Sequence, residues 1–128
     1  MAKVALVVDD SMLIRYSICR FLEDRGFAVE AASDGSEALE VLNRVQPDLI
    51  VTDMKMPKLS GGELMAALKG KPQTASVPII VITSKANGPC DLKFADFTIF
   101  KDIDIETQLD KALDGIPGMT HMRGQAAN

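Results

Sequence analysis

Residues 48–57 of the chain read DLIVTDMKMP, and the run from Leu49 to Thr52 within them decides the fold class. Apolar side chains stand at successive positions of this run rather than at alternate ones, so a strand here is buried on both faces. Residues 79–82 have the same character. Strands of this kind are typical of a parallel sheet that helices cover on each side. The two runs are therefore predicted to be central strands of an α/β sheet.

Outward from these runs, apolar segments of strand length alternate with segments of helical period. This order predicts a parallel sheet wrapped by helices. The second and fifth strands are the least apolar and are expected at the edges of the sheet. The five predicted strands are Val4 to Val8, Phe27 to Ala32, Leu49 to Thr52, Val77 to Thr83 and Phe97 to Phe100.

The helical segments begin at residues that favour caps and end at glycine or proline. The first predicted helix is Met12 to Arg25, before Gly26, and the third is Gly61 to Lys69. The second has its start marked by Ser33, Asp34 and Glu37, includes Val45 and is ended by Pro47; the last is capped by Asp102 or Asp104 and ended by Gly115 and Pro117. Between the last two strands, Asn87-Gly88-Pro89 interrupts the helical pattern. The fourth helix of the alternating order is therefore expected to be short or irregular, reduced to Cys90 to Asp96.

The 128 residues suffice for one domain, which we expect to span residues 1–116, with residues 117–128 as a flexible tail. The net charge of −4 and the lack of a Lys/Arg cluster argue against nucleic-acid binding, which needs a positive face. No apolar run approaches the ~20 residues of a membrane span. Cys19 and Cys90 form no CxxC pattern, which argues against a disulfide framework or a zinc site and favours the reducing cytoplasm.

Polar side chains stand at the ends of four predicted strands. They are Asp9 and Asp10 after the first, Asp53 after the third, Thr83 at the end of the fourth and Lys101 after the fifth. In an open parallel sheet, the carboxyl ends of the strands form the edge at which ligands bind. We therefore expect three acids, a hydroxyl and an ammonium to converge there.

Three carboxylates brought together repel one another, and their burial raises their pKa values unless a cation is present. Mg²⁺ prefers oxygen ligands and binds through one or two carboxylates, so the acids predict a magnesium site. Lys101 adds a fixed charge that can pair with a carboxylate or a phosphoryl oxygen. Each residue alone has an ordinary explanation as a turn, a cap or a solvated charge. The complete ordered set is what indicates a site.

The ordered set resembles the receiver domain of bacterial two-component response regulators, of the stand-alone kind used in chemotaxis. The resemblance extends from about Lys3 to Ile116. Its most specific residues are Val7-Val8-Asp9-Asp10-Ser11 with Arg15, Asp48 to Pro57, Gly61, Ile82-Thr83-Ser84 and Phe100-Lys101. It implies a three-layer, doubly wound, flavodoxin-like fold whose five parallel strands have the order 2-1-3-4-5.

The resemblance also implies a role for each residue of the set. Asp53 would be the phosphoacceptor, whose carboxylate attacks a phosphorus atom activated on a kinase histidine and forms an acyl phosphate. Thr83 would donate its hydroxyl to one phosphoryl oxygen, and Lys101 would pair with another. The ligands implied for Mg²⁺ are Asp9, mainly through water, Asp10, Asp53 and the backbone carbonyl of Lys55.

The function that the resemblance implies is that of a single-domain response regulator. It would accept a phosphoryl group from a sensor histidine kinase or a phosphotransfer protein and signal through an unidentified downstream protein. Its own catalysis would be limited to self-phosphorylation and self-dephosphorylation. The expected location is the cytoplasm, with no nucleic-acid or membrane partner, and the formation of a homodimer is left open.

Two departures from the family pattern affect the last part of the chain. Asp102 follows Lys101 where the family usually has proline, often after a cis bond. Because a non-proline cis bond costs ~2.5 to 4 kcal/mol, a trans bond is predicted here. Thr98 stands where the family usually carries an aromatic residue that takes part in switching.

Two other functions remain open. The altered stretch from Ser84 to Asp102 is compatible with a receiver-like docking module that works without phosphorylation. A magnesium-dependent phosphohydrolase with an aspartyl nucleophile would need Asp-x-Asp after the first strand, where the chain has Asp9-Asp10-Ser11, and an insert that holds substrate. The presence of every acceptor and metal residue favours the phosphorylated regulator.

Overall fold

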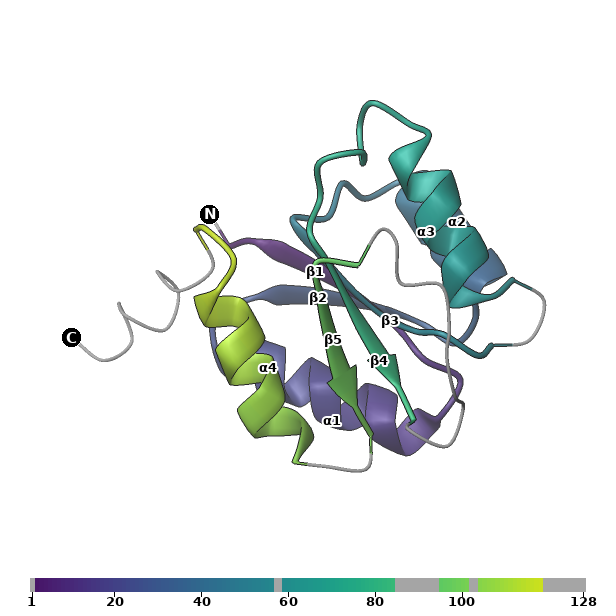
Figure 1. Ribbon diagram of the computed structural model, residues 1–128. Coiled ribbons are helices and arrows are strands. Elements are labelled where there is room, and N and C mark those ends of the chain that lie inside the picture. The colour runs from purple at the N-terminus through teal and green to yellow at the C-terminus, as the bar shows by residue number, and fades with distance from the viewer. Residues whose placement is uncertain (1, 57–58, 85–94, 102–103, 119–128) are drawn as a thin grey trace.

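The structure is a computed structural model that describes residues 2–56, 59–84, 95–101 and 104–118. Figure 1 shows strands and helices alternating along the chain as far as β4. The strands are β1 (Val4–Val8), β2 (Ala28–Ala32), β3 (Leu49–Asp53), β4 (Ile79–Thr83) and β5 (Phe97–Phe100). The helices are α1 (Met12–Glu23), α2 (Gly35–Leu42), α3 (Gly61–Lys69) and α4 (Ile105–Asp114).

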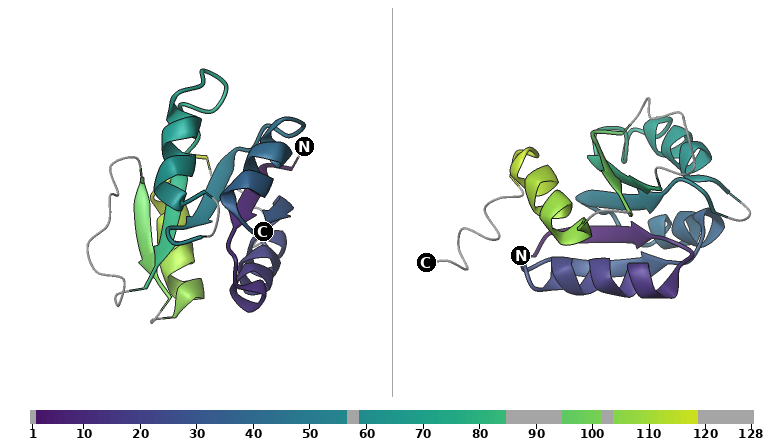
Figure 2. Two further views of the ribbon diagram at one scale, coloured as in Figure 1. Left: turned by 90° about the vertical axis from the view of Figure 1, so that its right-hand side faces the viewer. Right: turned by 60° about the horizontal axis from the view of Figure 1, so that its bottom comes forward.

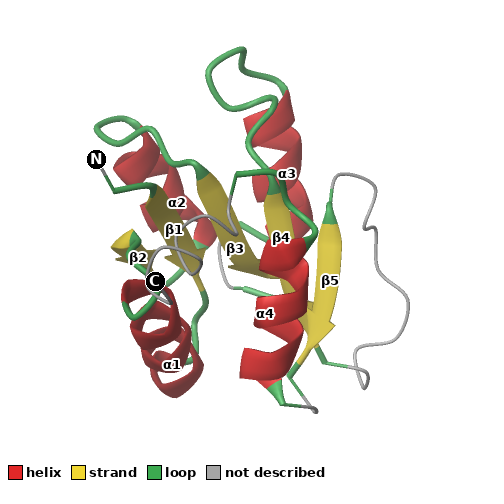
Figure 3. Cartoon of the chain, turned by 90° about the vertical axis from the view of Figure 1, so that its left-hand side faces the viewer, coloured by secondary structure: helices red, strands yellow, loops and turns green. Residues whose placement is uncertain are grey.

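The five strands form one parallel sheet in the order β2-β1-β3-β4-β5. The helices α1 and α4 cover one face of the sheet, and α2 and α3 cover the other (Figures 1 and 2). On the first face, α1 packs on β1 and β2, and α4 packs on β5 (Figure 3). This three-layer arrangement confirms the predicted α/β fold and its strand order.

The side chains of the strands divide between two cores, one on each face of the sheet. In β1, Ala5 and Val7 pack with α1 and α4, whereas Leu6 and Val8 pack with α2 and α3. Successive side chains of a strand point to opposite faces, so one short strand contributes to both cores. Every residue of β3 and β4 is buried, as the sequence predicts for strands covered on both faces.

Polar side chains cap the amino end of each helix by accepting a hydrogen bond from a backbone N–H three residues later. The caps are Ser11 for α1, Asp34 for α2, Ser60 for α3 and Asp104 for α4. Of the two candidates that the sequence offers for the last helix, Asp104 is therefore the cap. Beyond α1, Gly26 has a φ of 92°, which glycine adopts without steric cost.

Several predicted boundaries are wrong by a few residues. β4 begins at Ile79 rather than Val77, because Pro78 has no N–H for the strand ladder. β2 begins after Phe27, whose N–H bonds back to the end of α1. The helix α1 ends two residues earlier than predicted, and β3 extends one residue further, to Asp53. The helix α2 ends at Leu42, before Val45 and Pro47, whereas α4 ends at Asp114 with Gly115 as its cap, as predicted.

Some predictions fall on residues outside those that the structure describes. They are the short fourth helix from Cys90, the trans bond between Lys101 and Asp102, and the tail beyond Gly118. No helix in the described part of the chain is both long enough and apolar enough to cross a membrane.

Candidate functional site

The carboxyl ends of neighbouring strands bring the predicted polar residues to one edge of the sheet. The register of β1 against β3 places Asp9 beside Asp53. The register of β4 against β5 places Lys101 just beyond Thr83, and the N–H of Lys101 donates to the Thr83 carbonyl at 2.9 Å. Residues from four separate strands thus meet because parallel strands all end on the same side.

Lys101 is the positive centre of this site. Its Nζ donates a hydrogen bond of 2.9 Å to Oδ2 of Asp53 and lies 3.5 Å from Oδ2 of Asp9. The side chains of Asp9 and Asp53 are only 1% and 3% exposed, so solvent ions screen these contacts little. One ammonium therefore balances part of the charge of two buried carboxylates.

Burial and charge shift the pKa values of all three groups. Burial raises the pKa of Asp53, against the hydrogen bond and charge of Lys101, which favour the ionised form. Burial likewise raises the pKa of Asp9, where the backbone N–H of Ser11 opposes it and the charge of Asp53 adds to it. Burial by itself would lower the pKa of Lys101, but its two carboxylate partners outweigh that effect and raise the pKa. The site thus holds more negative charge than Lys101 neutralises.

The donor set fits a divalent cation. One carboxylate oxygen from each of Asp9, Asp10 and Asp53 can be chosen so that all three lie within 4.8 Å of one another. Among the described residues, Oδ2 of Asp9 and Oδ1 of Asp53 are buried and have no hydrogen-bond partner. Buried oxygens without a donor are costly unless a cation or water satisfies them. Closely spaced carboxylate oxygens are the ligands that Mg²⁺ prefers.

Local contacts hold Asp9 in place from the start of α1. The N–H of Ser11 donates to Oδ1 of Asp9 at 2.8 Å, and Ser11 in turn caps the helix. The guanidinium of Arg15, one turn further along α1, donates to the Asp9 carbonyl at 2.7 Å. Both oxygens that Asp9 uses in these bonds differ from Oδ2, which stays directed to the charged groups of the site.

A close backbone approach positions Asp53 from the other side. Gly61, the first residue of α3, donates its N–H to the Met54 carbonyl at 3.0 Å. A Cβ atom at Gly61 would lie 2.2 Å from the Asp53 carbonyl oxygen, which is far inside any real contact. The sequence pattern singles out Gly61 by its distance from the acid, and the structure gives the physical reason.

Three other residues singled out in the sequence, Thr83, Lys55 and Thr98, differ in how deeply they are buried. Thr83 is buried at the end of β4, next to Lys101. The side chain of Lys55 is exposed. Its backbone N–H lies near the Asp53 carboxylate and favours the ionised form, but burial has the larger effect and raises the pKa of Asp53. The metal-binding role of the Lys55 carbonyl stays a prediction. Thr98 is a half-buried residue of β5.

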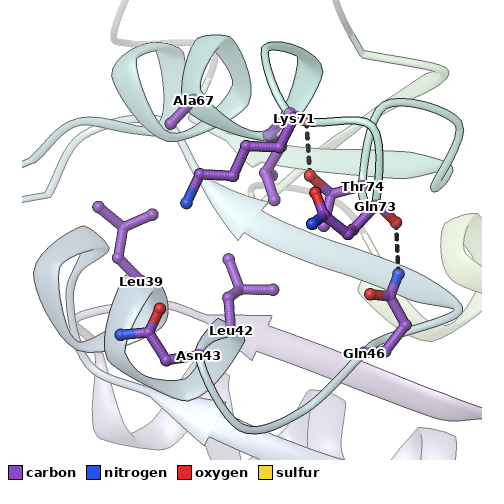
Figure 4. Close-up of a pocket in the computed structure, with 9 residues that line it drawn as sticks. Leu39, Leu42, Asn43, Gln46, Ala67, Lys71, Gln73 and Thr74 are labelled. Atoms are coloured by element: carbon purple, nitrogen blue, oxygen red, sulfur yellow. Dashed lines mark hydrogen bonds between the residues drawn. The ribbon is translucent and has the colours of Figure 1, made fainter.

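A separate hollow lies near the amino ends of the strands, away from the acids. It has a volume of about 260 Å³ and opens between the carboxyl ends of α2 and α3 (Figure 4). Its lining includes the apolar Leu39 and Leu42, with Gln46 hydrogen-bonded across it to the Gln73 carbonyl. No acid lines this hollow, so it does not belong to the metal-binding edge.

One residue near the site went unnoticed in the sequence. Gln108 of α4 exchanges hydrogen bonds with the backbone of Phe100, the residue before Lys101. A lone glutamine at the start of an amphipathic helix gives no signal of such a contact, because surface glutamines are common there. Only the folded chain shows it.

Comparison with known families agrees with this geometry. The sequence model described as "Response regulator receiver domain" matches residues 5–114. The response regulator MprA of Mycobacterium leprae is 41% identical over 80 residues, which are 62% of this chain and 34% of that protein. The gliding motility regulatory protein of Myxococcus xanthus is 40% identical over 82 residues, 64% of this chain and 11% of that protein. The chain thus matches only a minor part of these longer relatives.

Solved structures give the same result for the fold. The chemotaxis response regulator CheY4 of Vibrio cholerae superposes with a TM-score of 0.77 at 30% identity, over 91% of this chain and 100% of that one. The receiver domain of a sensor histidine kinase from Pseudomonas aeruginosa has a TM-score of 0.76 at 23% identity, over 87% and 93% of the two chains. That structure holds a magnesium ion in its active-site cleft.

Proposed function

Because the chain belongs to the response regulator receiver domain family, we propose that Asp53 accepts a phosphoryl group from a phosphohistidine of a sensor histidine kinase or a phosphotransfer protein. The observation that carries this proposal is the environment of the Asp53 carboxylate. Its Oδ2 accepts from Lys101, while its Oδ1 is buried without a hydrogen-bond partner among the described residues. The receiver domain would span residues 1–116.

The proposed reaction is an in-line transfer between two nucleophiles. A carboxylate oxygen of Asp53 forms a bond to phosphorus with one of its electron pairs, and the bond from phosphorus to the histidine nitrogen breaks. The electrons of that bond leave with the imidazole. Lys101 then pairs with a phosphoryl oxygen, and Thr83 donates its hydroxyl to another. The chain contributes position and counter-charge, which is most of what phosphoryl transfer requires.

A bound Mg²⁺ would neutralise the negative charge that Lys101 leaves unbalanced and the charge of the incoming phosphoryl group. Asp10, Asp53 and the backbone carbonyl of Lys55 would hold it, and Asp9 would contribute mainly through water. Two observations support this assignment: Oδ1 of Asp53 is buried without a hydrogen-bond partner among the described residues, and one oxygen from each acid lies within 4.8 Å of the others.

Phosphorylation would act as a switch whose output is a protein contact. We propose a downstream protein as the target, with homodimer formation as one possible form of output, and no nucleic-acid or membrane partner. The chain would have no catalysis beyond its own phosphorylation and dephosphorylation. A cytoplasmic location goes with this proposal, since that is where histidine kinases present their phosphohistidine.

The test is phosphorylation of the purified chain by acetyl phosphate with Mg²⁺, followed by intact mass and by peptide mapping. We expect one added phosphoryl group on Asp53, which should not form when EDTA is present from the start of the reaction or when the chain carries Asp53→Asn. The matched control Asp24→Asn, at an exposed acid after α1, should be phosphorylated like the wild type. Failure of the wild-type chain to take label from acetyl phosphate, phosphoramidate or a phosphohistidine donor would refute the proposal.

The same reagents separate the switch from a docking module that ignores phosphorylation. In NMR spectra, beryllofluoride with Mg²⁺ should shift the backbone signals around Asp53 if the site binds a phosphoryl-like group. Spectra that do not change would favour the docking module.

A further inference from the structure

The side-chain amide of Gln108 holds the backbone immediately before Lys101. Its Oε1 accepts from the N–H of Phe100 at 2.9 Å, and its Nε2 donates to the carbonyl of Phe100 at 2.9 Å. Nε2 also lies 3.2 Å from the carbonyl of Asp104, the cap of α4. One amide thus forms hydrogen bonds with the backbone of both Phe100 and Asp104.

The geometry of an edge strand explains how the Gln108 amide reaches the backbone of Phe100. β5 is the last strand of the sheet, so one of its sides has no neighbouring strand in the part of the chain that the structure describes. Backbone groups of successive strand residues point to opposite sides. Because the N–H of Lys101 bonds to Thr83 of β4, both polar groups of Phe100 face the open side. The Gln108 amide satisfies them as a sixth strand would.

Lys101 directly follows Phe100, the residue whose backbone the Gln108 amide holds. Its N–H is fixed to Thr83 on one side, and Phe100 is fixed to Gln108 on the other. Its Nζ, at the end of a long side chain, lies 2.9 Å from Oδ2 of Asp53. The residue that follows is Asp102, so no proline ring restricts the backbone there. A shift of Phe100 would therefore carry the Lys101 ammonium out of position.

We propose that Gln108 is a positioning residue for phosphoryl transfer, which acts through Lys101 by fixing the Phe100 backbone. This inference rests on the proposed function, because it assigns Gln108 to the same reaction. Gln108 does not touch the acids, and its effect requires the lysine that it positions. Removing the amide should therefore slow phosphorylation only in a chain that still carries Lys101.

The experiment is a double-mutant cycle on the rate of Asp53 phosphorylation by acetyl phosphate with Mg²⁺. Gln108→Leu should lower the rate at least about tenfold, since a displacement near 1 Å of a catalytic group costs up to ~10²-fold. In the Lys101→Ala background the same substitution should change the rate less than about twofold. Gln46→Leu is the matched control, because it also removes an amide-to-carbonyl hydrogen bond, but far from the acids.

Gln108→Glu keeps the proposal testable should Gln108→Leu fail to fold. Glutamate retains the acceptor for the Phe100 N–H and loses the donor for its carbonyl, so its rate should lie between those of the wild type and Gln108→Leu. Thermal unfolding of each variant verifies that it is folded at the assay temperature. An unchanged rate in folded Gln108→Leu, or an equal fold-loss with and without Lys101, would overturn the inference. In either case a wild type labelled on Asp53 leaves the proposed function intact.

Discussion

Asp53 and Lys101 form a pair whose stability depends on both partners. Removing Lys101 would leave two buried carboxylates without their counter-charge, at a cost of about 3 to 5 kcal/mol. Removing Asp53 would leave Lys101 beside Asp9 and would relieve part of the repulsion among the acids. Substitutions at either residue therefore alter stability as well as chemistry. A residue that shapes the backbone of Asp53 without carrying charge gives a cleaner measure of how tightly the site is packed.

Gly61 is such a residue, and its neighbour provides the control. Gly61→Ala should lower the free energy of unfolding by about 1 to 3 kcal/mol, because the new Cβ must displace the Asp53 carbonyl and the Met54 backbone. At Gly62, a Cβ would meet nothing closer than 3.8 Å. Gly62→Ala should therefore leave stability unchanged or raise it by about 0.5 to 1 kcal/mol.

Urea unfolding followed by circular dichroism measures both glycine substitutions. The phosphorylation rate of Gly61→Ala should also fall, since Asp53 is moved. Equal stabilities of the two variants would contradict the close approach at Gly61.

The helix α3 has a reciprocal amino-terminal cap, and it begins eight residues after Asp53 in the sequence. Ser60 accepts from the Glu63 N–H at 3.1 Å, and the Glu63 side chain accepts from the Ser60 N–H at 3.0 Å. This reciprocal capping box satisfies two backbone donors that the helix leaves unpaired. It fixes the start of α3, and therefore the position of Gly61 against the backbone carbonyl of Asp53.

Ser60→Ala should lower the free energy of unfolding by about 1 kcal/mol, because the Glu63 N–H loses its acceptor. Ser36→Ala is the matched control, since Ser36 is exposed in the first turn of α2 and is not the cap of that helix. Its effect should stay within about 0.5 kcal/mol. Chemical denaturation of the two variants in parallel provides the measurement, and a larger loss at Ser36 would be inconsistent with the capping box.

Across the whole molecule, two cores hold the sheet rigid while its carboxyl edge concentrates negative charge. Each of β1, β3 and β4 contributes side chains to both cores, so the strand ends that carry the acids cannot separate without disrupting both. The repulsion among Asp9, Asp10 and Asp53 is therefore retained in the folded state and relieved by a cation. A ligand that binds only the folded chain stabilises it by mass action.

Mg²⁺ should raise the thermal midpoint of the wild-type chain, with a stabilisation of about 2.7 kcal/mol at a hundred times its Kd. Asp10→Asn should lose most of this shift, because it removes a ligand from an exposed position that does not disturb the core. Asp24→Asn should retain it. Calorimetry with and without EDTA measures the shift, and a shift of equal size in Asp10→Asn would show that Mg²⁺ binds elsewhere.

The amino-acid sequence alone determined the order of strands and helices, the two-sided burial of the central strands, and the identity of the acids, Thr83 and Lys101. These features follow from short-range patterns: the period of apolar residues, capping residues, and polar residues directly after strands. Among the described residues, the errors lay at element ends, such as Val77, where a single proline decides between strand and loop, and the end of α2 at Leu42.

Only the tertiary structure decided how these residues meet. Which oxygen of Asp53 faces Lys101, why Gly61 tolerates no side chain, and how Gln108 reaches Phe100 all depend on distances between segments that are far apart in the chain. Such distances are set to within an ångström by the packing of both cores at once. No local pattern in the sequence carries that information, because the same residues at the same spacing could fold with a different register or rotamer.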